Sequence, residues 1–262
     1  MTITLFSPDE LLLFFFLTAR IGAIVFTLPF LGSRIVPFPL KILLIFLLSL
    51  GLYPVVQGQG IRFAPAPLGV LGLLLLGEVL LGITIGMVVQ ILFAAVRFGG
   101  EVFSHQIGLS IANIFDPQQE QQSSLIGQFL YILSVLLFFT LRAHHWFIYA
   151  MAESLHKIPL LGIITPWAVR QALLPLMGRL FIIAIQIGAP VLVVSLLSIL
   201  SMGIIARLVP QINIFILSLP VSLSIGLMVL GLALPYLFGQ MQALFGQLGR
   251  ELFLVIQLME TR

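Results

Sequence analysis

Two ionisable side chains stand inside long apolar stretches, where a charge could do chemistry. Arg20 lies midway through the first such stretch and Glu78 lies inside the third. A charge at the centre of a bilayer costs roughly 3 kcal/mol on insertion scales, so each group needs a partner or an aqueous cavity. A proton relay would need further polar groups, which these stretches lack. We therefore favour a buried ion pair, between Arg20 and Glu78 or with a neighbouring subunit, and we also predict Glu101 and Arg207 to be buried and paired between helices or subunits.

The adjacent histidines His144 and His145 could suggest a metal site. Successive helical residues point about 100° apart, so the two rings cannot bind one ion from one helix, and no carboxylate stands at a suitable spacing. The stretch "RAHHWF" instead fits a helix end at the level of the lipid headgroups. The sequence has no cysteine, no glycine-rich phosphate loop and no Gly-x-Ser-x-Gly motif. We predict no catalytic residues, no metal and no cofactor, and hence no enzyme.

The composition places these groups in an integral membrane protein. Of the 262 residues, 60% are hydrophobic and only 8% are charged, against about 25% charged in soluble domains. The net charge of +3 is scattered along the chain, so nothing indicates binding to nucleic acid. Six apolar stretches are long enough to cross a bilayer, and no cleavable signal peptide is expected. These stretches are 11–30, 40–56, 68–96, 125–141, 172–205 and 212–238.

Two of these stretches are too long or too rich in proline for one straight crossing. The stretch 172–205 holds Pro175 and Pro190, which favour two helical pieces or one kinked helix. The stretch 212–238, with two prolines of its own, invites the same interpretation. Lysine and arginine counts are six on one side and four on the other, which does not decide the orientation.

The end of the chain, 240–262, has a different pattern within what we predict to be a single domain, 1–262. Apolar residues recur there at steps of three and four, with polar residues on the other side, which predicts an amphipathic helix. We favour a helix that lies on the membrane surface, and docking on a partner protein is the alternative.

A polar segment, "GLSIANIFDPQQEQQSSLIG" at 108–127, interrupts the apolar sequence. Asp116 suits the N-cap of a helix and Pro117 its first position, so we predict a helix from 117 to 141. The preceding helix should continue beyond Val96, because polar residues at helical spacing follow it. Between the two helices we expect either a surface loop or a re-entrant loop at a channel.

Four pieces of sequence, in order and with matching spacing, resemble the FliR family, the R subunit of the flagellar type III secretion export gate, whose injectisome relatives are called SctT. The piece "ARLVPQINIF" is more similar to flagellar members, and the injectisome T subunit is the alternative. "GGE" here replaces the usual "AGE", and "AHHW" replaces the usual "GH". The four pieces are "RIGAIVFTLPFLGSRIVPFPLKILLIFLLSLGLYP" at 20–54, "GGEVFSHQIGLSIANIFDP" at 99–117, "HHWFIYAMAESLHKIP" at 144–159 and "APVLVVSLLSILSMGIIARLVPQINIFILSLPVSLSIGL" at 189–227.

This resemblance implies an all-α integral membrane protein of about six long, partly broken hydrophobic helices. They would pack as hairpins in a helical multi-subunit assembly in the bacterial inner membrane, at the flagellar basal body and raised towards the periplasm. The implied partners are several copies of the P and Q subunits, a B subunit wrapped around them, an A subunit nearby, membrane lipid and unfolded export substrates. The gate would be passive, with the driving energy supplied by other components.

The resemblance also implies that the loop 107–123 is a plug that closes the pore. Its apolar obstruction would be Ile111, Ile114 and Phe115. The full set of expected plug residues is Ile107, Gly108, Ile111, Asn113, Ile114, Phe115, Asp116 and Pro117. A competing hypothesis is a small-solute secondary transporter with a site at Arg20 and Glu78, but the repeated halves typical of such folds are not visible.

Overall fold

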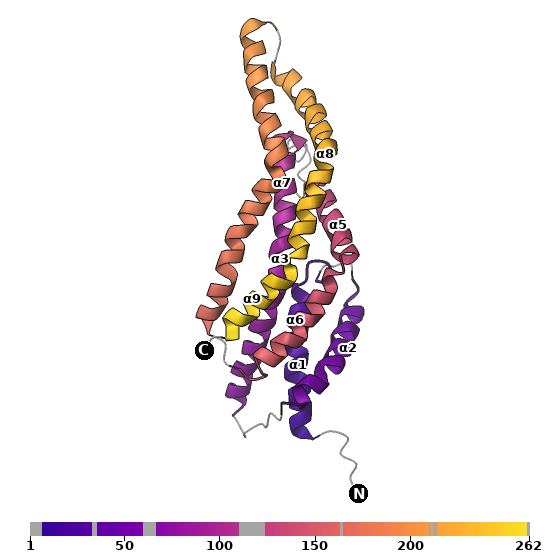
Figure 1. Ribbon diagram of the computed structural model, residues 1–262, viewed down its shortest axis with the longest axis vertical. Coiled ribbons are helices and arrows are strands. Elements are labelled where there is room, and N and C mark those ends of the chain that lie inside the picture. Colours follow the sequence, from indigo (N-terminus) through magenta and orange to yellow (C-terminus); the bar gives the residue numbers. More distant parts are fainter. Residues whose placement is uncertain are drawn as a thin grey trace. The chain divides into compact units, whose positions relative to one another are not determined.

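The computed structural model describes residues 7–32, 36–59, 67–109, 124–162, 165–209, 211 and 214–260. Regular structure within these ranges is helical (Figure 1). Five of these helices are long and apolar enough to cross a membrane, or six if the broken pair α5 and α6 is one span. The prediction of an all-α integral membrane protein is therefore confirmed.

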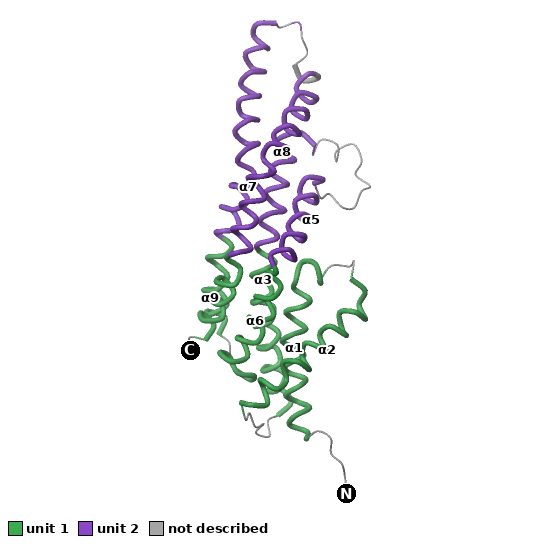
Figure 2. The backbone as a smooth tube through the Cα atoms, turned by 45° about the vertical axis from the view of Figure 1, so that its right-hand side comes forward, with its two compact units in different colours: residues 1–91, 142–177, 247–262 green, residues 92–141, 178–246 purple. Residues whose placement is uncertain are grey.

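The chain divides into two compact units, which Figure 2 colours separately. Unit 1 contains residues 1–91, 142–177 and 247–262. Unit 2 contains residues 92–141 and 178–246. Two long helices, α3 (Leu68–Gln106) and α7 (Pro166–Leu208), contribute residues to both units.

Unit 1 begins with a hairpin of α1 (Pro8–Thr27) and α2 (Phe38–Gln57), which pack on each other. A capping box fixes the start of α1: the amide of Glu10 donates to the Ser7 hydroxyl at 3.3 Å, and the amide of Ser7 donates to the Glu10 carboxylate at 2.7 Å. Phe14 of α1 contacts the rings of Phe46 and Tyr53 of α2. Other large side chains of α1, among them Phe16, Leu17 and Ile21, are almost completely buried and belong to the core of the unit.

The last helix, α9 (Leu248–Glu260), completes unit 1 by packing on α6 (Ala143–Lys157). Its apolar face is buried within the chain, and the indole of Trp146 lies so close to Gly249 that an added Cβ would be 3.0 Å from the ring. The predicted helix over 240–262 is thus divided, because 240–246 belong to the preceding helix. We had predicted that this apolar face would lie on a membrane surface or on a partner protein. Within the chain it packs instead on α6, which offers an apolar face of its own. The buried residues of α9 are Leu248, Gly249, Glu251, Leu252, Val255, Ile256 and Met259.

Unit 2 contains α5 (Leu125–Thr140) and α8 (Ile214–Gly246), together with the later parts of α3 and α7. Three buried phenylalanines from three helices form its aromatic core. Phe93 lies 5.6 Å from Phe138 and 5.1 Å from Phe245, measured between ring centroids. The remaining pair is 5.8 Å apart. These edge-on and tilted contacts are the favoured geometry of aromatic pairs and connect α3, α5 and α8.

The structure corrects two sequence predictions about helix boundaries. Residues 166–208 form one continuous helix through Pro175 and Pro190, so of the two alternatives for 172–205, two helical pieces or one kinked helix, the first is wrong. A proline removes a hydrogen bond, but a long helix can continue past it when its neighbours supply the packing. The helix predicted from 117 to 141 does not run through Ser124, which has an extended backbone and caps α5 (Leu125–Thr140), while 117–123 lie outside the described residues.

Candidate functional site

The first stem of the predicted plug is the turn that ends α3. Gly108 has φ 82°, a left-handed conformation that favours glycine after a helix. The amides of Ile107 and Gly108 donate to the carbonyls of Phe103 and His105 at 3.3 and 3.2 Å. Ile107 is only 1% exposed. Its side chain fills the space above Gly226 of α8, where an added Cβ would overlap it, and we call this space the Gly226 notch.

The second stem is the start of α5, which is joined to α3 by its backbone. The Ser124 hydroxyl accepts from the amide of Gly127 at 2.7 Å and donates to the carbonyl of Gly100 at 3.3 Å. A Cβ on Gly100 would lie 2.6 Å from the Cα of Gly127, and one on Gly127 would lie 3.2 Å from the carbonyl oxygen of Arg97. Two small residues thus allow the backbones of α3 and α5 to touch.

Both stems lie beside the same part of α3. Gly100 and Ile107 are seven residues apart, which is roughly 10 Å along a helix axis. The two attachments that flank the segment 110–123 are therefore both on the last part of α3. Of the expected plug residues, Ile107 and Gly108 are placed here. The others lie outside the described residues: Ile111, Asn113, Ile114, Phe115, Asp116 and Pro117.

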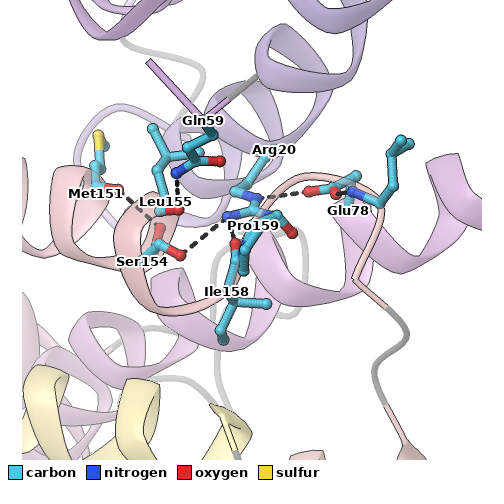
Figure 3. Close-up of polar contacts among 9 residues, drawn as sticks. Arg20, Gln59, Glu78, Met151, Ser154, Leu155, Ile158 and Pro159 are labelled. Atoms are coloured by element: carbon cyan, nitrogen blue, oxygen red, sulfur yellow. Dashed lines mark hydrogen bonds and ion pairs between the residues drawn. The ribbon is translucent and has the colours of Figure 1, made fainter. Parts of the chain in front are cut away.

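Arg20 and Glu78 form a buried ion pair in unit 1 (Figure 3). The Arg20 Nε donates to Glu78 Oε2 at 2.5 Å, and the two side chains are 0% and 1% exposed. The guanidinium also donates to the carbonyls of Ser154, Ile158 and Pro159 at 3.2, 2.9 and 3.5 Å. The carbonyls of Ser154 and Pro159 also accept from the amides of Ile158 and Gly162, so Arg20 adds a charged donor to the turn that follows α6.

Glu78 uses its second oxygen on the same loop. Its Oε1 accepts from the amide of Leu161 at 2.8 Å. Leu161 has φ 72°, a left-handed conformation that costs a branched residue roughly 1–3 kcal/mol. Both carboxylate oxygens and all three guanidinium nitrogens therefore bind groups of this chain. This arrangement favours a structural pair over the solute site of a transporter, because the charged atoms are already occupied.

A glycine face on α3 lets this pair form. Glu78, Gly82 and Gly86 follow each other at steps of four and share one face of α3. A Cβ on Gly82 would lie 2.5 Å from the carbonyl oxygen of Arg20, and one on Gly86 would lie 2.7 Å from the Cβ of Thr27. This small-xxx-small spacing brings the backbones of α1 and α3 close together in unit 1. The short distance between helices holds Glu78 against Arg20.

The other two charges that we predicted to be buried are not buried within this chain. The Glu101 side chain is 34% exposed and lies 3.5 Å from Arg97, one turn earlier on α3. Arg207 is exposed near the end of α7. Glu101 lies beside the start of α5, where a Cβ on Gly127 would come within 3.5 Å of its side chain, and it is covered only in part. Pairing with a neighbouring subunit stays a prediction for both.

The two histidines lie at the start of α6. Arg142, directly before this helix, has φ 54°. The rings of His144 and His145 are 4.4 Å apart between centroids and nearly perpendicular. Within the part of the chain that the structure describes, no three His, Cys, Asp or Glu residues come together in a way that could hold a metal ion.

Sequence reasoning missed the residues that hold the two stems. Ser124 was passed over because Asp116 and Pro117 form a stronger local N-cap signal. Gly100, Gly127 and Gly226 are scattered in sequence, and only the fold brings each one against another backbone or side chain. The spacing of Gly82 and Gly86 is a sequence signal that could have been found, since glycines four residues apart in an apolar stretch mark close helix packing.

Fold and site together define a multi-pass helical membrane protein. Its two most buried charges among the described residues, Arg20 and Glu78, form an ion pair with each other. The profile of a family described as bacterial export proteins, family 1, matches residues 11–248. The chain therefore belongs to this family of bacterial export proteins.

Curated relatives agree with this family. The flagellar biosynthetic protein FliR of Pectobacterium carotovorum subsp. carotovorum is 34% identical over 226 residues, covering 85% of this chain and 84% of that protein. FliR of Buchnera aphidicola subsp. Schizaphis graminum is 32% identical over 236 residues, covering 90% of each chain. FliR of Bacillus subtilis is 31% identical over 225 residues, covering 84% of this chain and 85% of that protein.

Proposed function

We propose that this chain forms part of the pore through which unfolded flagellar proteins cross the inner membrane, and that the segment 107–123 plugs this pore. The family establishes the general role: the chain is a multi-pass inner-membrane subunit of the flagellar export apparatus. All the relatives reported above carry a flagellar name, which favours the flagellar system over the injectisome.

The observation that carries the plug proposal is the pair of stems on α3. A segment that leaves and re-enters the protein beside the same stretch of helix is tethered at both ends. It can occupy an opening next to unit 2 without being carried away by a passing chain. The polar and apolar residues of 110–123 suit an opening that is wet and yet must be blocked.

The exposed apolar surface of unit 2 supports assembly with other subunits. Many large side chains of α7 and α8 are more than half exposed within this chain, for example Leu200 at 57% and Leu232 at 76%. Apolar surface of this extent is buried by lipid or by other proteins. The proposed partners are the P and Q subunits, with the B subunit around them, the A subunit nearby and lipid on the remaining surface.

Mechanistically, we propose a passive gate. The sequence has no nucleotide-binding motif, and the two most buried charges among the described residues, Arg20 and Glu78, are engaged in an internal pair. Export energy would then come from other components, and this chain would supply a path and its closure.

Ion leakage tests the plug. Cells that express this chain with the P and Q subunits are compared with cells that express a variant lacking 107–123. We expect leakage only from the deletion, and only when the partners are present. If the complex with the deletion assembles but does not leak ions, the plug proposal is wrong and the segment is a surface loop.

A further inference from the structure

A groove runs between α7 and α8, which lie side by side in unit 2 (Figure 2). Its volume is about 580 Å³, within the range of pockets that hold small molecules. Apart from Tyr236, every residue that lines it is apolar, and several are small. The lining includes Ala189, Val193 and Val194 of α7 and Val229 and Ala233 of α8. The groove can therefore hold a narrow apolar chain.

One end of this groove is polar. Pro190 has no N–H group, so the carbonyl of Gln186 lacks the donor that an α-helix would give it. The Tyr236 hydroxyl of α8 donates to this carbonyl at 3.3 Å. The Gln186 side chain is itself exposed and carries an amide that can donate to a ligand. A hydroxyl and an amide thus stand where the apolar lining ends.

A cation follows on the same face of α7. Arg179, Gln186 and Val193 are seven residues apart, which is close to two full turns, and all three side chains are exposed. From Val193 towards Arg179 the face changes from apolar, through neutral and polar, to positively charged. A phospholipid has the same order in its acyl chain, its ester groups and its phosphate.

The distances along α7 fit one leaflet of a bilayer. Arg179 and Val194 are fifteen residues apart, or roughly 22 Å at 1.5 Å per residue, and half of a bilayer with its headgroups is about 20–22 Å. Arg207 lies a further thirteen residues along the helix, so that it is roughly 42 Å from Arg179, close to the whole thickness. With Arg179 at one headgroup layer, the groove ends near the bilayer centre, where an acyl chain ends.

We propose that unit 2 binds one membrane phospholipid, with an acyl chain in the groove between α7 and α8 and the phosphate at Arg179. The Gln186 amide donates to an ester carbonyl, and the guanidinium of Arg179 binds the phosphate by charge-assisted hydrogen bonds. An apolar helix of another subunit would also fill the groove, but it would not supply an anion for the cationic end. No residue of 107–123 contributes to this site, so the proposal is independent of the plug.

A photoreactive phospholipid tests the position of the acyl chain. Phosphatidylglycerol with a diazirine on one acyl chain is added to membrane vesicles that contain this chain assembled with the P and Q subunits. After illumination, we expect the label to concentrate at 189–194 and 229–236 relative to Ile199, which is exposed on α7 outside the groove. Equal labelling of Ile199 and the groove, or cross-links from the groove to another subunit in place of lipid, would overturn the proposal.

Lipid titration of the purified complex, followed by native mass spectrometry, tests the phosphate. Arg179→Gln should weaken the binding of phosphatidylglycerol about tenfold, because charge-assisted hydrogen bonds are lost. Arg207→Gln, at the other end of the same helix, is the matched control and should bind as the intact complex does. Diacylglycerol with the same acyl chains has no phosphate, so Arg179→Gln should not change its binding. Equal binding of phosphatidylglycerol by the two arginine variants would overturn the proposal.

A size change tests the groove in the same titration. Ala189→Leu places a larger side chain in the groove and should weaken the binding of both lipids. The control is Gly203→Leu, which adds a similar side chain to α7 at a position with nothing within 4 Å of the new Cβ. If Ala189→Leu binds both lipids as well as this control does, the acyl chain does not occupy the groove and the proposal is wrong.

Discussion

Exchanging Arg20 and Glu78 tests whether they form a simple ion pair or a clamp on the loop 158–161. Coulomb attraction does not depend on which helix carries which sign. The neighbours do distinguish the two arrangements. The carbonyls of Ser154 and Ile158 accept from a donor at position 20, and the amide of Leu161 donates to an acceptor at position 78.

The loss of folding stability caused by the exchange can be estimated from these contacts. A hydrogen bond to a charged group contributes about 1.5–3 kcal/mol, so three well-formed bonds amount to roughly 5 kcal/mol or more. Removing one partner of a buried pair costs about 3–5 kcal/mol. The exchange R20E/E78R should therefore be at least as destabilising as Glu78→Gln alone. Because whole domains are stable by only about 5–15 kcal/mol, we expect little of the exchanged protein to fold.

The assay is the amount of chain recovered from the membrane, together with its melting temperature in detergent. The control is the exchange of Lys157 and Glu260, which lie 3.5 Å apart and are 46% and 40% exposed. That exchange should change stability by less than about 1 kcal/mol. If R20E/E78R melts like the intact protein while Glu78→Gln is unstable, the hypothesis that the pair holds the loop 158–161 is wrong, and the two residues form an ordinary ion pair.

Two smaller predictions follow from other close contacts. Gly82→Ala should destabilise unit 1 by about 1–3 kcal/mol, because its Cβ would meet the backbone of α1, whereas Gly72→Ala on the same helix meets nothing within 4 Å and should be neutral or stabilising in the same melting assay. Ser124→Ala removes the N-cap of α5 and should cost about 1 kcal/mol, while Ser124→Asp, which keeps an acceptor for the Gly127 amide, should retain most of that stability. Equal melting of the two Ser124 variants would show that the cap does not hold the second stem.

The membrane spans were predictable because they depend only on local composition. An apolar stretch of about 20 residues has few alternatives to a helix, and the broad placement of α1, α2 and α5 follows. Arg20 and Glu78 were predictable as candidates for pairing for the same reason, since an isolated charge in such a stretch is too costly. The contact of this pair with the loop 158–161 was not predictable, because every residue has a backbone carbonyl and the sequence does not show which ones a side chain will bind.

The packing of α9 shows where local reasoning fails. Its amphipathic pattern is equally suited to a membrane surface, a partner protein or another helix of the same chain. Only the fold brings α6 to it, with Tyr149 and Phe253 in ring contact at 5.6 Å between centroids. The helix start at Ser124 was missed in a similar way, because its hydroxyl bonds to Gly100, a residue 24 positions earlier.

Unit 1 is assembled from three separate stretches of chain, the last of which is α9. During synthesis the ribosome releases all of unit 2 before it releases residues 247–260. The core of unit 1 therefore stays open on its α6 side until nearly the whole sequence has been translated. A chain without α9 would leave this apolar face of α6 uncovered. The order of the segments along the sequence thus makes the closing of the first unit depend on a helix that is synthesised after the second.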